Sequence, residues 1–135
     1  MDKKYRFYGL KSEEGNCVHP GLRDFLIKEV NDLINKEGSE FKKDSDIYKK
    51  AEITRQTRNN IINGYVAPTL DNALKIGFTM RLEEGRFWVF LDYCGYVLYE
   101  KTLFNILMKK CIHDHVTLDE ARKRLINNKI TNRLL

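Results

Sequence analysis

Apolar residues recur at intervals of three and four along most of the chain after Pro20. The first such stretch has its apolar positions at Leu22, Phe25, Leu26, Val30, Leu33 and Ile34, and Gly38 follows as a stop. This spacing places the apolar side chains on one face of an α-helix, so it predicts a helix of roughly four turns. Only two prolines and eight glycines interrupt the 135 residues. A sandwich of many short strands would need more turn residues than this.

The same periodicity and its flanking caps predict further helices at about 45–51, 54–63, 68–78, 103–111 and 117–126. Asp44 or Ser45 is expected to cap the first of these. Thr54 is expected to cap the second, and Gly64 to end it. Thr117 and Glu120 have the spacing of a capping box at the start of the last helix.

Two segments are less regular. Residues 86–99 fit either a hairpin that turns at Gly95 or a helix over 84–93 that ends there, and the helical neighbours favour the helix. Residues 1–19 lack helical spacing and are expected to form an arm, in which Tyr5, Phe7 and Leu10 are compatible with a short strand. The expected fold is therefore all-α. It is a helix-turn-helix domain at 20–80 with a C-terminal helical extension at 81–135, packed as one compact unit, and a possible short N-terminal β arm.

Several functional classes are disfavoured by what the sequence contains. The longest apolar run has five residues (87–91), too few to span a bilayer. The N-terminus lacks the apolar segment of a secretory signal. Three cysteines without a pairing motif favour a reducing, cytoplasmic setting. Phosphate-binding glycine loops, paired-carboxylate motifs and serine elbows are missing, so we expect neither an enzyme nor a cofactor.

A short cluster, Cys111, His113 and His115, resembles a set of metal ligands. Zinc sites in proteins use four ligands, usually in two separated pairs. The remaining histidine, His19, is far away in the sequence. We therefore interpret the cluster as the end of a helix and the loop before Thr117, and predict no metal site. The aromatic residues around Trp88 are interpreted as core or as an oligomer interface.

The formal net charge of +5 mildly favours polyanionic partners, and the positive charge is locally concentrated. Residues 48–66 contain four basic residues and one acidic residue, and residues 121–135 contain five basic residues and no acidic one. The C-terminal run is compatible with a second nucleic-acid contact, with an ordinary charged face or with a partner-binding tail.

One helix surface combines side chains suited to reading DNA. Over residues 55–63 the carboxamides of Gln56, Asn59, Asn60 and Asn63 fall on one side of a helical wheel. Thr57, Arg58, Ile61 and Ile62 fall on the other. Carboxamides can form paired hydrogen bonds with adenine in the major groove, and Arg55 could reach a guanine or a phosphate. The alternative is a solvated surface in an asparagine-rich protein.

The stretch from Asp46 to Gly64, followed by Pro68 to Ile76, resembles the phage-repressor-type (Xre/Cro-like) helix-turn-helix family. The resemblance lies in a small residue at Ala51, Ile53-Thr54 after the turn, Asn63-Gly64 and Pro68 at the family's intervals, and it covers about Leu22 to Met80. The later part of the chain is more loosely similar to helical extensions of such modules.

This resemblance implies a recognition helix at 54–63 that lies in the major groove of double-stranded DNA. Arg55, Gln56, Asn59 and Asn60 would read bases, and Thr54 would meet a phosphate at the helix N-terminus. The full set of candidate DNA-binding residues is Thr54, Arg55, Gln56, Asn59, Asn60, Lys49, Lys50 and Arg58. The implied protein is a bacterial or phage transcriptional regulator that acts as a homodimer. The alternative is a protein-binding module on the same scaffold, such as a phage-encoded inhibitor of a host nucleic-acid enzyme.

Two positions depart from the family pattern. Glu52 occupies the turn position that usually holds glycine, and a left-handed backbone costs other residues roughly 1–2 kcal/mol. A turn of different geometry is therefore the alternative here. Arg58 occupies a usually apolar position, so its guanidinium is expected to extend outward beside Ile61 or Ile62.

Overall fold

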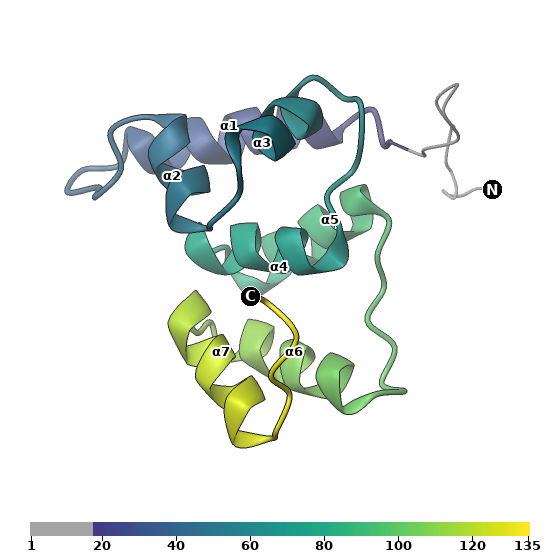
Figure 1. Cartoon of the computed structure of the whole chain (residues 1–135). Helices are drawn as coiled ribbons and strands as arrows, with labels where there is room; N and C mark the ends of the chain where they lie inside the picture. Colours follow the sequence, from purple (N-terminus) through teal and green to yellow (C-terminus); the bar gives the residue numbers. More distant parts are fainter. Residues whose placement is uncertain (1–17) are drawn as a thin grey trace.

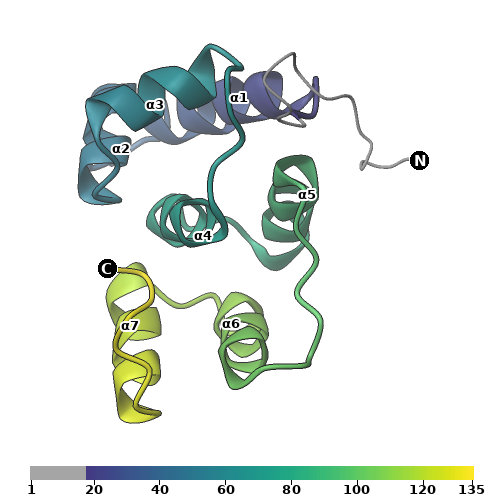
Figure 2. The ribbon, with the colours of Figure 1, turned by 45° about the vertical axis from the view of Figure 1, so that its right-hand side comes forward.

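A computed structural model of the chain describes residues 18–135, which form seven α-helices and contain no strand. The helices are α1 (Leu22–Ile34), α2 (Asp44–Lys50), α3 (Arg55–Ile62), α4 (Leu70–Thr79), α5 (Glu84–Cys94), α6 (Leu103–His113) and α7 (Leu118–Asn127). They lie in three layers: α1 to α3, then α4 and α5, then α6 and α7 (Figures 1 and 2). The all-α fold class is confirmed. The expected β arm falls within residues 1–17, outside the described part of the chain.

The first helix is shorter than its stop signal suggested. α1 ends at Ile34 with Asn35 as its C-cap, four residues before the expected stop. Gly38 instead takes a left-handed conformation (φ +77°) in the loop that leads to α2. The glycine therefore shapes the connection and not the helix end.

The start of α2 also differs from the prediction by one residue. Its N-cap is Lys43, not Asp44 or Ser45. The reason is Asp46, whose carboxylate accepts hydrogen bonds from the backbone amides of Lys42 (3.0 Å) and Lys43 (3.3 Å). An acidic side chain in the first turn thus satisfies the amides ahead of the helix.

The start of α7 realises half of the predicted capping box. The Thr117 hydroxyl accepts a hydrogen bond from the Glu120 amide at 3.1 Å. The Glu120 carboxylate, however, accepts from Arg124 Nε at 3.2 Å. Thr117 therefore caps the helix as predicted. The Glu120 carboxylate forms an ion pair with Arg124 of the same helix in place of the reciprocal capping-box contact.

The ambiguous segment is a helix, and the hairpin alternative is wrong. α5 ends at Gly95, whose φ of +91° closes the helix in a left-handed conformation. Its buried face consists of Phe87, Phe90, Leu91 and Cys94. These positions recur at intervals of three and four, so burial on one side selects the helix.

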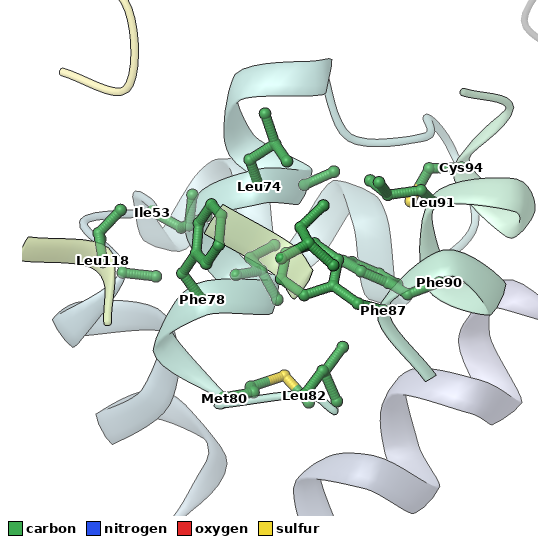
Figure 3. Packing of buried hydrophobic residues seen from close by; sticks show 14 of the residues in the cluster. Ile53, Leu74, Phe78, Met80, Leu82, Phe87, Phe90, Leu91, Cys94 and Leu118 are labelled. Carbon is green, nitrogen blue, oxygen red and sulfur yellow. The ribbon is translucent and has the colours of Figure 1, made fainter. Parts of the chain in front are cut away.

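The core is centred on α4 and α5 (Figure 3). The rings of Phe78 and Phe87 meet edge to face with centroids 5.0 Å apart. Phe25 of α1 stacks on Phe90 of α5 at 5.8 Å, which joins the first layer to the middle one. Leu118 of α7 lies near Phe78 and joins the third layer (Figure 3). The buried side chains of all three layers form one cluster.

Candidate nucleic-acid interface

The turn between α2 and α3 keeps the left-handed geometry despite the absence of glycine. Glu52 has a φ of +61°. Its amide donates to the Lys49 carbonyl at 2.9 Å, and the Ile53 amide donates to the Tyr48 carbonyl at 2.9 Å. These two bonds satisfy the last carbonyls of α2 in a Schellman motif, with buried Ile53 as its apolar contact. The alternative of a differently shaped turn is therefore wrong.

The N-terminus of α3 is capped as predicted. The Thr54 hydroxyl accepts from the Thr57 amide at 3.2 Å and donates to the Thr57 hydroxyl at 2.9 Å. The amides of Arg55 and Gln56 belong to the first turn, where a helix offers no internal acceptor. An anion at this exposed end would meet those amides and the positive end of the helix dipole.

The exposed face of α3 largely matches the wheel. Gln56, Asn59 and Asn63 are exposed, whereas Ile61 is buried and Ile62 is partly buried. No hydrogen bond to residues 18–135 occupies the carboxamides of Gln56 or Asn63, so both are available to a ligand.

Asn60 departs from the wheel, because it is half-buried and not fully exposed. Its carbonyl accepts from the amides of Tyr65 (2.9 Å) and Val66 (3.4 Å), where the chain folds back toward α4. Its carboxamide, like that of Gln56, makes no hydrogen bond within the described residues. The returning loop thus covers part of Asn60 without using its side-chain polar atoms.

Arg58 is directed toward α2 and does not simply extend beside the isoleucines. Its side chain is 22% exposed, and its Nη1 lies 4.0 Å from the Asp44 carboxylate. Its Nη2 donates to Asn59 Oδ1 at 3.2 Å. Arg58 therefore links α3 to the first turn of α2 and holds one of the four carboxamides.

The two α2 lysines differ in their surroundings. Lys50 pairs with both oxygens of Glu40 at 3.0 Å and lies 5.6 Å from the centroid of the Phe41 ring. Lys49 is exposed and has no ionic partner within residues 18–135. The same holds for Arg55 at the start of α3. Lys49 and Arg55 are thus the two candidate cations whose charge is not neutralised by a neighbour in the described part of the chain.

The structure adds residues that the sequence patterns did not single out. Tyr65 follows the left-handed Gly64 at the end of α3, and 64% of it is exposed. Arg23 of α1 donates through Nε to the Ile62 carbonyl at 2.9 Å and so satisfies the C-terminal end of α3. The Asn63-Gly64 turn was a signal for an exposed loop next to the helix. No local pattern indicated the contact of Arg23, because 39 residues separate it from Ile62.

Most of the basic residues near the C-terminus form ion pairs with acidic residues of the same molecule. Arg122 pairs with Glu52, Arg124 with Asp114, and Arg133 with Asp71. Lys123 and Lys129 are the members of the run without an ionic partner in the described part of the chain. Of the three interpretations, the structure favours an ordinary charged face, because three of the five basic side chains are paired within the molecule and do not form a continuous basic surface.

The cysteine and histidine cluster is not assembled into a ligand set. Cys111 is buried, His113 contacts the Glu84 carboxylate at 3.1 Å, and His115 Nε2 lies 2.9 Å from the Arg81 carbonyl. Among residues 18–135 no three His, Cys, Asp or Glu side chains are grouped so as to hold a metal ion. Within the same residues, no helix has the length and apolar character needed to cross a membrane.

Comparisons of the chain with models of protein families, with curated proteins and with solved structures found no match in any of the three. The chemistry of the exposed α3 face therefore carries the functional argument by itself.

Proposed function

We propose that this chain is a sequence-specific double-stranded DNA-binding protein, a transcriptional regulator that inserts α3 into the major groove. The observation that carries the proposal is the surface of α3. Gln56, Asn60 and Asn63 present carboxamides that no described residue occupies, at an eight-residue helix that contains no acidic side chain. Carboxamides of this kind can pair with the N6 and N7 edge of adenine.

The surroundings of α3 support the same proposal. Arg55 and Lys49 supply positive charge that no described neighbour neutralises, and the open amides at the start of α3 suit a phosphate. Tyr65 at the other end of the helix adds an exposed hydroxyl that could donate to a second phosphate. In this proposal the phosphate contacts fix the helix on the duplex, and the carboxamides discriminate between bases.

The test is selection from a random duplex pool at physiological salt. We expect enrichment of a palindromic motif with half-sites about one helical turn apart, because the proposed regulator acts as a homodimer. The Gln56→Ala, Asn60→Ala double variant should lose on the order of 1–3 kcal/mol per lost base contact on the enriched site. Asn127→Ala, which removes an exposed carboxamide from α7, is the matched control and should bind normally.

Salt dependence separates the proposal from a trivial attraction to polyanions. Specific binding should weaken steeply with salt and still discriminate between the enriched site and a scrambled duplex. A double variant that binds the enriched site as tightly as the unaltered chain would exclude the proposed reading face.

A second candidate, a protein-binding module, is favoured by a different surface. Val97, Tyr99, Leu103 and Ile106 are exposed apolar side chains close together in the chain, between the end of α5 and the second turn of α6. Grouped apolar exposure of this kind is typical of protein contacts. If the duplex pool yields no enriched sequence, this candidate replaces the first, and α3 becomes part of a scaffold.

A further inference from the structure

Glu52 is bound to a residue of the last helix. Its carboxylate accepts from Arg122 Nη2 at 2.7 Å, across 70 residues of sequence. The same guanidinium donates through Nε to the Leu134 carbonyl at 2.7 Å. Arg122 therefore ties the turn before α3 to the C-terminal segment of the chain.

That segment is itself anchored on the middle layer (Figure 1). Leu134 is fully buried, and its amide donates to Asp71 Oδ2 at 3.0 Å. Arg133 Nε donates to both oxygens of the same carboxylate at 2.9 and 3.1 Å. Asp71 lies in the first turn of α4, directly after the loop that leaves α3.

Two more contacts hold the segment in place. The Arg133 guanidinium lies 3.6 Å from the centroid of the Phe104 ring of α6. Lys75, a lysine of α4 that is only 6% exposed, donates to the main-chain oxygen of Leu135 at 2.8 Å. We refer to Arg122 with residues 131–135 as the C-terminal clasp.

The clasp thus holds the chain on both sides of α3. Glu52 lies two residues before the Thr54 cap, and Asp71 lies two residues after the Thr69 cap of α4. α3 itself contributes one fully buried side chain, Ile61. A helix with few buried side chains takes part of its orientation from what holds its ends, so the clasp acts on α3 together with the contacts of Arg58 and Arg23 described above.

We propose that the C-terminal clasp sets the orientation of α3, so that Glu52, Asp71 and Arg122 are positioning residues for DNA binding. As far as DNA is concerned, this rests on the proposed function. Base reading requires side chains held to within about 0.5 Å and 10–20° of their productive geometry. Release of the clasp would rotate or loosen α3 and misplace Gln56 and Asn60 together.

The choice of residue at position 52 supports the proposal. Glycine would adopt the left-handed conformation without strain, yet the chain has a glutamate there. Its side chain makes the only ion pair between this turn and α7 within the described residues. The backbone strain at Glu52 is therefore accompanied by an ion pair with Arg122 that glycine could not form.

Glu52→Gly provides the sharpest test, because it removes the ion pair with Arg122 and at the same time relieves the backbone strain of the turn. We expect its thermal midpoint to be no lower than that of the unaltered chain. Amide hydrogen exchange in α3 should become roughly tenfold faster, and affinity for the enriched duplex roughly tenfold weaker with the same preferred sequence. Loss of an acidic residue near DNA would by itself strengthen binding, so weaker binding cannot come from charge alone.

Arg122→Ala and Lys123→Ala form a matched pair on α7. Each removes one positive charge, but Lys123 has no ionic partner in the described residues. We expect faster exchange in α3 for Arg122→Ala and unchanged exchange for Lys123→Ala. Exchange in α3 that stays at the unaltered rate in both Glu52→Gly and Arg122→Ala would overturn the clasp. Hydrogen exchange needs no DNA, so failure of the duplex selection would count against the proposed function and leave this test intact.

Discussion

Glu52, Arg81 and His115 occupy the same left-handed position in three successive helix–turn–helix units, with φ of +61°, +56° and +56°. Each turn continues with a buried or half-buried apolar residue and an extended N-cap residue. None of the three is glycine, although glycine would adopt this conformation without strain. Their side chains explain the choice, since each one contacts a distant element.

The Arg81 and His115 turns hold each other. Arg81 Nη2 donates to the His115 carbonyl at 2.8 Å, and His115 Nε2 lies 2.9 Å from the Arg81 carbonyl. A left-handed non-glycine residue costs roughly 1–2 kcal/mol. A hydrogen bond to a charged group contributes about 1.5–3 kcal/mol. The free-energy cost of the left-handed backbone is thus similar in size to the stabilisation from the side-chain hydrogen bond that a non-glycine residue can make there.

Glycine is required for a different reason at position 77. A Cβ atom at Gly77 would lie 2.4 Å from Cζ of the buried Phe87 ring. Gly77→Ala should therefore destabilise the protein by about 1–3 kcal/mol through overpacking, as measured by urea unfolding.

Gly85 is the matched control for that variant. It lies in α5 without a left-handed backbone, and a Cβ atom there would meet no atom of the described residues within 4 Å. Gly85→Ala should stabilise the protein by about 0.4–1 kcal/mol, because alanine restricts the unfolded chain. Equal effects of the two substitutions would contradict the close approach of α4 to α5 at Gly77.

At the level of the helices, local sequence signals were sufficient to predict a helix and its ends where an apolar face and a capping residue occur together. The Thr54 cap and the Gly64 and Gly95 ends follow from rules that involve only a few neighbouring residues. A helix end differs from its predicted position where another side chain binds the backbone amides. The Asp46 carboxylate does this at the start of α2. The contacts of Arg122 and Arg133 could not be predicted, because 70 and 62 residues separate them from Glu52 and Asp71.

The candidate site divides in the same way. The exposed positions of Gln56, Asn59 and Asn63 follow from helical periodicity alone. The partial burial of Asn60 and the pairing of Arg58 with Asp44 depend on the returning loop and on α2. Neither feature can be predicted from the spacing of polar and apolar residues over 55–63.

The threonine caps allow an element-level prediction. The hydroxyls of Thr54 and Thr117 accept from the amides of Thr57 and Glu120 at 3.2 and 3.1 Å. Replacing either threonine with alanine should lower the free energy of unfolding by about 1 kcal/mol. Serine at the same positions keeps the acceptor and should retain most of that stability in urea titrations. A serine variant as unstable as its alanine counterpart would show that the methyl group, and not the cap, matters.

Across the whole molecule, hydrogen-bonded carboxylates connect the layers and the helix ends. Burial alone would raise the pKa of Asp71, but the hydrogen bonds from Arg133 and the Leu134 amide outweigh it and lower the pKa. The hydrogen bond from the Arg124 side chain lowers the pKa of Asp114. The backbone amide of Lys42 lowers the pKa of Asp46. All three groups therefore favour the folded state only while they are ionised.

This arrangement predicts the acid sensitivity of the fold. A carboxyl whose pKa is lower in the folded state contributes stability that is present above its unfolded pKa, about 3.9, and lost as pH falls through the folded value. The free energy of unfolding should thus decline below about pH 4. Asp71→Asn should be less stable at neutral pH and should decline less steeply in acid, since the clasp has already lost its ionised anchor.

Urea titrations from pH 7 down to pH 2 would measure this decline. Asp92→Asn is the control, because its carboxylate is exposed and makes no hydrogen bond within the described residues. It should keep the slope of the unaltered chain. If Asp71→Asn kept that slope as well, the ionised Asp71 would not be what holds the C-terminal segment on α4. If only the amides of α6, α7 and residues 131–135 exchanged faster at pH 3, release of the clasp would precede unfolding of the two layers formed by α1 to α5.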